Sequence, residues 1–203
     1  NNGSALEMAD IVKNSAAILE CWMSGQFYAE VLTDVLKGKV NPCGRLAETL
    51  PLRFEDCSGY RYYVDDNDIV NYGDGELVGY KYNQSAGIVP AYPFGYGLSY
   101  TSFEYMGFEV SQKVTDGKNF SVTVTLKNTG KMGGKEVIQI YLKRKGEKTS
   151  ALTAFEKVFL APGEEKEVAI TLDELCFKRY SLSHKDYVIQ PGETLSSIAE
   201  RFT

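Results

Sequence analysis

Two carboxylates stand two positions apart in a glycine-rich segment, at Asp74 and Glu76. If this segment forms a β-strand, the two side chains lie on the same face of it. A close pair of carboxylates can raise the pKa of one member, which could then serve as a general acid. No nucleophile accompanies the pair, so hydrogen bonding to loop amides is the favoured interpretation. We therefore assign no catalytic residue to this chain.

The other candidate ligands lack the spacing of a metal site. The acidic run Asp65, Asp66, Asn67 and Asp68 has no Gly where a calcium loop needs one, which favours a solvated acidic loop. The cysteines form no C-x-x-C pair, and the single histidine is not at ligand spacing from them. These residues are Cys21, Cys43, Cys57, Cys176 and His184. We expect free thiols in a reducing compartment, a surface imidazole, no Cys-His nucleophile and no bound metal.

The composition excludes several classes of partner. The 203 residues carry 22 Lys and Arg against 27 Asp and Glu, a net charge of −5, so no nucleic-acid surface is expected. No apolar stretch approaches the ~20 residues of a membrane helix, so no membrane partner is expected. Gly73, Gly75 and Gly79 lack the strand before and the helix after that a nucleotide fingerprint requires, and no cofactor is assigned.

The first forty residues predict a helix, a strand and a second helix. Residues 5–14 suit a short helix, with Ser4 and Glu7 in a capping-box pattern. The apolar run 16–22 suits a strand buried on both faces of a parallel sheet, and residues 25–37 have helical spacing that ends at Gly38. One strand cannot form a sheet. We therefore expect either that the missing strands come from residues outside this chain, which starts without a Met, or that the segment is poorly ordered alone.

Two further patterns follow along the chain. Residues 41–100 are rich in turn residues and Tyr, which favours an ordered, loop-rich junction between domains, with direct sugar contact as the alternative. Short alternating runs then begin near residue 103 and are separated by turns at 128–130 and 161–163. The runs cover 120–126, 136–142, 155–160 and 168–172. Such spacing predicts an antiparallel β-sandwich.

Two strings in the loop-rich stretch resemble glycoside hydrolase family 3, in which they join an α/β-sandwich domain to a fibronectin type III-like domain. They run Tyr72-Gly73-Asp74-Gly75-Glu76-Leu77-Val78-Gly79-Tyr80-Lys81-Tyr82 and Pro93-Phe94-Gly95-Tyr96-Gly97-Leu98-Ser99-Tyr100-Thr101-Ser102-Phe103. Segments on both sides are similar to successive family motifs in the same order, and the resemblance covers residues 1 to about 192. The flanking segments are 1–4, 17–22, 25–26, 41–46, 127–130, 134–141 and 155–164.

The resemblance implies a fold class of an α/β fragment plus an all-β domain. Residues 1–58 would be the C-terminal part of an incomplete α/β-sandwich domain, 59–102 a Tyr/Gly-rich connector, and 103–192 a fibronectin type III-like, immunoglobulin-like β-sandwich. The family hydrolyses β-linked glucosides and related sugars with retention, using two carboxyl groups about 5–5.5 Å apart. One belongs to a barrel domain and the other usually precedes the segment like Asn1–Ser4. Neither motif occurs here, and in some members the barrel follows the fibronectin-like domain.

The sequence departs from the family pattern in three places. Phe27-Tyr28-Ala29 replaces a second Gly-rich element, and Asp74 replaces the usual Glu. The tail, residues 193–203, has helical spacing where the family continues as a strand. Taken alone, residues 187–202 resemble the first half of a LysM peptidoglycan-binding module. The alternative is a divergent edge of the sandwich.

The resulting hypothesis is that this chain is the C-terminal, non-catalytic portion of a retaining β-glucosidase-type enzyme. The chain would scaffold the catalytic domains and would be inactive alone. Its expected partners are the missing barrel and α/β domain, and a β-glucoside or oligosaccharide through them. The alternatives are a carbohydrate- or peptidoglycan-binding module and a purely structural remnant. The expected location is cytoplasmic, or extracellular and cell-wall associated if the tail is a LysM module. The sugar, the linkage and the oligomeric state do not follow from the residues.

Overall fold

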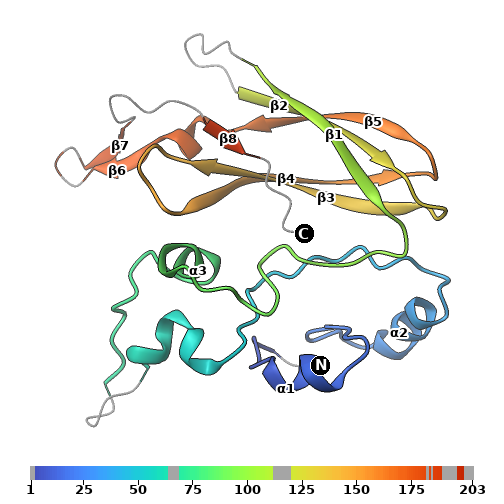
Figure 1. Ribbon diagram of the computed structural model, residues 1–203. Helices are drawn as coiled ribbons and strands as arrows, with labels where there is room; N and C mark the ends of the chain where they lie inside the picture. The colour runs from blue at the N-terminus through green and yellow to red at the C-terminus, as the bar shows by residue number, and fades with distance from the viewer. Residues whose placement is uncertain are drawn as a thin grey trace. The chain divides into compact units, whose positions relative to one another are not determined.

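The computed structural model describes residues 3–63, 69–111, 120–181, 183, 185–188 and 196–198 (Figure 1). The chain divides into two compact units. Unit 1 comprises Asn1–Val40 and Gly44–Gly97, and unit 2 comprises Asn41–Cys43 and Leu98–Arg201. The stretch 59–97, predicted as part of a separate connector, thus belongs to unit 1. The acidic run Asp65–Asp68 and His184 lie outside the described residues.

Unit 1 is built from short helices joined by long ordered loops. Its elements are α1 (Ala9–Asn14), α2 (Tyr28–Leu36), the 3-10 helices η1 (Phe54–Asp56) and η2 (Ser58–Arg61), and α3 (Tyr80–Ala86). An antiparallel bridge between Leu50 and Tyr92 connects two of its loops. Leu50 and Met8 are the buried hydrophobic residues of this unit within the described ranges. Most of its apolar side chains are therefore half-buried or exposed.

The predicted strand at 16–22 does not form. The segment pairs with no strand among the described residues, Trp22 has a positive φ of 47°, and Ile18 and Leu19 remain exposed. A strand needs a neighbour for its backbone N–H and C=O groups. The apolar run therefore has the composition of a buried strand, but among the described residues no sheet forms around it.

The first helix is shorter than predicted, and its capping box is absent. The carboxylate of Glu7 accepts a hydrogen bond from the backbone N–H of Phe54 (3.2 Å) instead of capping a helix. The N–H groups of Met8 and Ala9 donate to the carbonyls of Pro51 and Leu52 (3.0 and 3.2 Å). These contacts tie residues 7–9 to the loop at 51–54, and α1 begins only at Ala9.

The second predicted helix is confirmed as α2. It ends as expected before Gly38, whose φ of +69° lies in the left-handed region that favours glycine. None of its nine residues is buried, and Phe27, Val31 and Leu36 are all more than half exposed. Helix α3 was not predicted. Gly79 and Gly87, both with positive φ, flank its seven residues.

Unit 2 contains the predicted β-sandwich. One layer is the antiparallel sheet β1 (Phe103–Val110), β2 (Phe120–Asn128) and β5 (Glu165–Leu172), in the order β1-β2-β5. The other is the sheet β4-β3-β8, formed by β3 (Gly134–Lys143), β4 (Ser150–Leu160) and β8 (Ser196–Ile198) (Figure 1). A 3-10 helix η3 (Glu174–Phe177) and the hairpin β6 (Arg179–Ser181) and β7 (Asp186–Val188) complete the unit.

The core of unit 2 lies between its two sheets. In β2 every second residue is buried, which is the alternation expected of a strand with one face in a core. Both sheets contribute side chains to this core, and Phe177 stacks against Phe120 with ring centroids 4.3 Å apart. The core residues are Phe103, Phe120, Val122, Val124, Leu126, Ile138, Ile140, Val158, Leu160, Ile170 and Leu172.

The predicted helical tail is wrong for Ser196–Ile198. These residues form β8, which pairs antiparallel with Tyr141–Lys143 of β3. The open edge of β3 offers backbone hydrogen bonds that three residues of the tail satisfy, and this overrides the helical spacing of the side chains. No described helix is long and apolar enough to cross a membrane.

Candidate functional site

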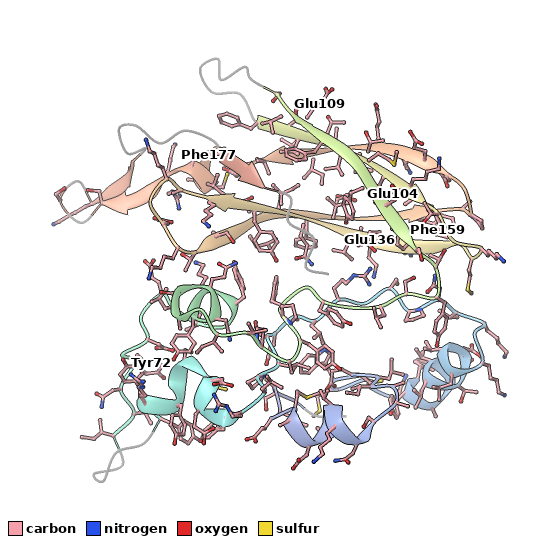
Figure 2. The ribbon with its side chains drawn as sticks, viewed as in Figure 1. Tyr72, Glu104, Glu109, Glu136, Phe159 and Phe177 are labelled. Carbon is pink, nitrogen blue, oxygen red and sulfur yellow. The ribbon has the colours of Figure 1, made fainter. Side chains whose placement is uncertain are left out.

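The carboxylate pair Asp74 and Glu76 lies in a turn, not on a strand. The two side chains therefore do not share a strand face, and the expected geometry of a paired acid is absent. Asp74 accepts a hydrogen bond from the hydroxyl of Ser58 (3.3 Å), and its carbonyl accepts from the N–H of Leu77 (2.9 Å). Its carboxylate thus holds η2 against the turn, in place of the predicted bond to loop amides. Tyr72, just before the turn, is 89 % exposed (Figure 2).

An ion pair between an exposed arginine and a buried aspartate fixes the loop after residue 50. The guanidinium of Arg53 forms two contacts with the carboxylate of Asp56, Nη2 to Oδ1 at 2.9 Å and Nε to Oδ2 at 3.3 Å. This hydrogen bonding, with the nearby positive charge, holds the pKa of Asp56 below its ordinary value and raises that of Arg53. A carboxylate held in its charged form by a permanent cation is a poor proton donor, so the pair is structural.

The four cysteines are free, as the sequence analysis expects of them. Burial raises the pKa of Cys57, and it raises that of Cys176 to about 11. A nucleophilic cysteine needs a lowered pKa. Neither thiol is therefore suited to nucleophilic chemistry. In the part of the chain that the structure describes, no three His, Cys, Asp or Glu side chains gather as a metal site.

Residues 41–43 belong to unit 2, and the side chain of Asn41 holds them there with three hydrogen bonds. Its Oδ1 accepts hydrogen bonds from the Ser99 hydroxyl and the Tyr100 N–H, each at 2.9 Å, and its Nδ2 donates to the Gly133 carbonyl at 3.2 Å. Three separate stretches of chain thus meet at one amide. The sequence analysis includes Asn41 only in the turn-rich stretch 41–100 and in the family-like segment 41–46, and assigns it no role of its own.

Asn128 plays the matching role inside the sandwich, where it is fully buried. Its Oδ1 accepts from the Thr101 hydroxyl (2.7 Å) and the Gly130 N–H (3.1 Å). Its Nδ2 donates to the carbonyls of Met132 (2.9 Å) and Leu160 (3.1 Å). Since both atoms have two partners, the side chain fixes the turn after β2 against the end of β4.

A hydrogen bond between two side chains also joins the two sheets of the sandwich. The hydroxyl of Tyr105 on β1 donates to the carboxylate of Glu136 on β3 at 3.2 Å, and Glu136 is buried. Figure 2 labels Glu136 on its strand. The bond spans the layers, so it contributes to their registration.

An open groove of about 580 Å³ runs along unit 2 where the free edges of β4 and β5 face each other. It is lined by residues 152–156 of β4 and 169–171 of β5. Glu156 is the one carboxylate in this lining. Retaining glycoside hydrolysis requires two facing carboxyl groups, so the groove cannot perform that reaction.

Two family profiles match the chain in the order that the fold suggests. The glycosyl hydrolase family 3 C-terminal domain matches residues 1–100, and the fibronectin type III-like domain matches residues 136–199. The chain belongs to the C-terminal region of glycoside hydrolase family 3. The second match extends through β8, so residues 193–199, predicted to begin a LysM module, belong with the fibronectin-like domain instead.

Curated relatives agree with this assignment. The chain is 45 % identical over 201 residues to thermostable β-glucosidase B of Acetivibrio thermocellus, covering 96 % of the chain and 26 % of the relative. It is 38 % identical over 198 residues to an exo-α-(1→6)-L-arabinopyranosidase of Bifidobacterium longum, with 95 % and 26 % covered. The chain thus spans about a quarter of the length of these relatives and aligns with their non-catalytic C-terminal region.

A solved structure confirms the fold. The crystal structure of a family 3 β-glucosidase from Bifidobacterium adolescentis superposes with a TM-score of 0.85 at 32 % identity, covering 97 % of this chain and 32 % of that one. The family assignment therefore holds for both units of this chain.

Proposed function

We propose that this chain is a scaffold of a retaining β-glucosidase-type glycoside hydrolase, with the catalytic carboxyl groups supplied by other parts of the parent enzyme. The observation that carries the proposal is the number of exposed apolar side chains between residues 18 and 36 of unit 1. They are Ile18, Leu19, Met23, Phe27, Val31 and Leu36. Met23 is 81 % exposed and Leu36 is 69 % exposed. Exposed apolar side chains in this number within one segment indicate an interaction site.

The rest of the α/β domain is the proposed occupant of this surface. The segment 16–22 lacks a strand partner among the described residues, and a neighbouring parallel strand would supply one. Helix α2 would then cover that sheet with Phe27, Val31 and Leu36. The relatives are about four times as long as this chain, which leaves ample sequence for such strands.

The substrate of the parent is proposed at the level of its class. One relative is a β-glucosidase and another an α-L-arabinopyranosidase, so close similarity in this region accompanies different sugars. A glycoside with a neutral sugar is the common element. The sugar itself would be selected by residues that this region does not hold.

Association with the remainder of the parent polypeptide tests the scaffold role. We expect residues 1–203 to bind the separately produced remainder, and Val31→Gln to weaken that binding by about tenfold, because burying a valine side chain contributes about 1.5–3 kcal/mol. Glu30→Gln, on the same helix and also exposed, is the matched control and should bind as the unmodified chain does. Equal affinities for the two variants would exclude the α2 surface from the interface.

A further inference from the structure

The two outer faces of the sandwich, those turned away from its core, carry opposite charge. In β2 every second side chain is buried, so the side chains between them point outward, and their partners on β1 and β5 share that side of the sheet. The charged members of this surface are Glu104, Glu109, Lys127, Glu165 and Glu167. Four carboxylates against one ammonium give this surface, here called the acidic face, a net charge of −3.

A β-bulge brings both glutamates of β1 onto the acidic face. Glu104 and Glu109 are separated by an odd number of positions, which would place them on opposite sides of a regular strand. The extra residue Met106 shifts the register, so both side chains point outward from β1, where Figure 2 labels them. The middle of the face consists of small residues, namely Gly107, Thr123, Thr125 and Ala169. A Cβ at Gly107 meets nothing within 4 Å, so the space above this residue is open.

The outer face of the other sheet carries aromatic rings and lysines. In residues 155–160 of β4, the side chains that alternate with the core residues point outward, and so do their partners on β3. These outward residues are Phe155, Lys157 and Phe159 on β4, and Lys135, Val137 and Gln139 on β3. Phe155 is 66 % exposed and Phe159 is 52 % exposed. No carboxylate is among these residues, so this surface, here called the basic face, has a net charge of +2.

The two faces complement each other in side-chain size and in charge. The basic face presents large rings beside lysines, whereas the acidic face presents small side chains bordered by glutamates. Neither Lys135 nor Lys157 forms an ion pair with a described residue. Two basic faces would repel each other, and so would two acidic faces. A basic face therefore fits the acidic face of another copy better than it fits a second basic face.

We propose that the basic face of one chain docks on the acidic face of a second copy of this chain. Phe155 and Phe159 would cover the small residues in the middle of the acidic face, and the lysines would lie beside its glutamates. Because the two faces lie on opposite sides of the sandwich, the contact is head-to-tail and no two-fold symmetry closes it at a dimer. The contact involves unit 2 alone, so it does not depend on the exposed apolar side chains of unit 1.

Sedimentation velocity of the 203-residue chain at rising concentration tests the proposal. At low salt we expect the average mass to rise above the 22.6 kDa of the monomer, and to fall again as added salt screens the charges. Phe155→Ser should weaken the association by about tenfold, since buried aromatic residues contribute most of the affinity of an interface. Phe27→Ser is the matched control, because Phe27 is 64 % exposed and belongs to unit 1. It should associate as the unmodified chain does.

Charge reversal tests whether the contact is head-to-tail. Lys157→Glu and Glu167→Lys alter the basic and the acidic face respectively, and each alone should weaken self-association by about tenfold. An equimolar mixture of the two variants should associate again. The reason is that the unchanged basic face of the Glu167→Lys chain fits the unchanged acidic face of the Lys157→Glu chain.

Three results would overturn the docking assignment. The first is a folded chain that stays monomeric at low salt over the whole concentration range. The second is self-association that Phe27→Ser weakens as much as Phe155→Ser does, which would place the contact on unit 1. The third is a mixture of the two charge variants that associates no better than either variant alone.

Discussion

The side-chain amide of Asn41 donates a hydrogen bond to the carbonyl of Gly133, 92 positions further along the chain, at 3.2 Å. The same side chain accepts from Ser99 and Tyr100, so one residue of the N-terminal half is held by two loops of the sandwich unit. This arrangement explains why residues 41–43 belong to unit 2 although residues on both sides belong to unit 1. The side chain of Asn41 therefore attaches residues 41–43 to the sandwich through its hydrogen bonds.

Replacing Asn41 by alanine should lower the free energy of unfolding of the sandwich by about 2–3 kcal/mol. The change removes three hydrogen bonds, each worth about 1 kcal/mol, and leaves the Gly133 carbonyl without this donor. Urea denaturation followed by circular dichroism measures the effect. Asn14→Ala is the control, because the Asn14 side-chain amide donates to the Asp10 carbonyl at an exposed helix end. Similar losses in both variants would contradict the anchor role.

Gly134→Ala should destabilise the chain by about 1–3 kcal/mol, the usual range for overpacking a core. A Cβ at this position would lie 2.6 Å from the Asn41 amide nitrogen and 2.9 Å from a methyl carbon of Thr101. Gly107→Ala is the matched control on another strand, because a Cβ there meets nothing within 4 Å. The control should be neutral or slightly stabilising. Thermal melts that rank the two variants in the reverse order would refute the tight approach of Asn41 to β3.

The ion pair of Arg53 and Asp56 predicts a specific dependence of stability on pH. Its hydrogen bonds lower the pKa of Asp56 in the folded state, so the contribution is fully present above the ordinary aspartate pKa of about 3.9. It is lost as the pH falls through the lowered pKa. Melting temperatures of the unmodified chain and Asp56→Asn should therefore differ near neutrality and converge below about pH 3.9. A constant difference across this range would show that the charge of Asp56 does not matter.

Cys176 should react slowly with alkylating reagents. With a pKa of about 11 instead of the ordinary 9.0, its thiolate fraction near neutral pH is roughly one-hundredth of that of an unperturbed thiol. Mass spectrometry after timed exposure to iodoacetamide measures the rate in the folded chain. Denaturation in urea should restore the ordinary rate. Fast alkylation of Cys176 in the folded chain would contradict its burial.

The sandwich could be predicted because its strands carry their own signal. The residues of β2 alternate in hydrophobicity, and each strand both packs its apolar face and pairs with a neighbour inside the same unit. The tail lacked such a signal. Residues 196–198 have helical spacing, and only the free edge of β3 makes them a strand. A pairing partner far away in the sequence is invisible to local periodicity.

Unit 1 was predicted less well, for a different reason. The run 16–22 has the composition of a buried strand, but the strand pairs that would bury it are absent from the described residues. Helix α3 has seven residues between two glycines, too few for a periodic pattern, although Gly87 with φ of +68° is a usual helix end. The roles of Asn41 and Asn128 depend on loops brought together by the fold, which sequence spacing cannot reveal.

Hydrolysis of an aryl β-glucoside by the purified 203-residue chain tests the scaffold account most directly. The account predicts no release of the aryl alcohol above that of a heat-denatured sample, while the full-length parent enzyme turns over under the same conditions. Sustained turnover that follows the purified chain through successive columns, and that the groove variant Glu156→Gln abolishes, would show that these residues hold a catalytic site and would contradict the account.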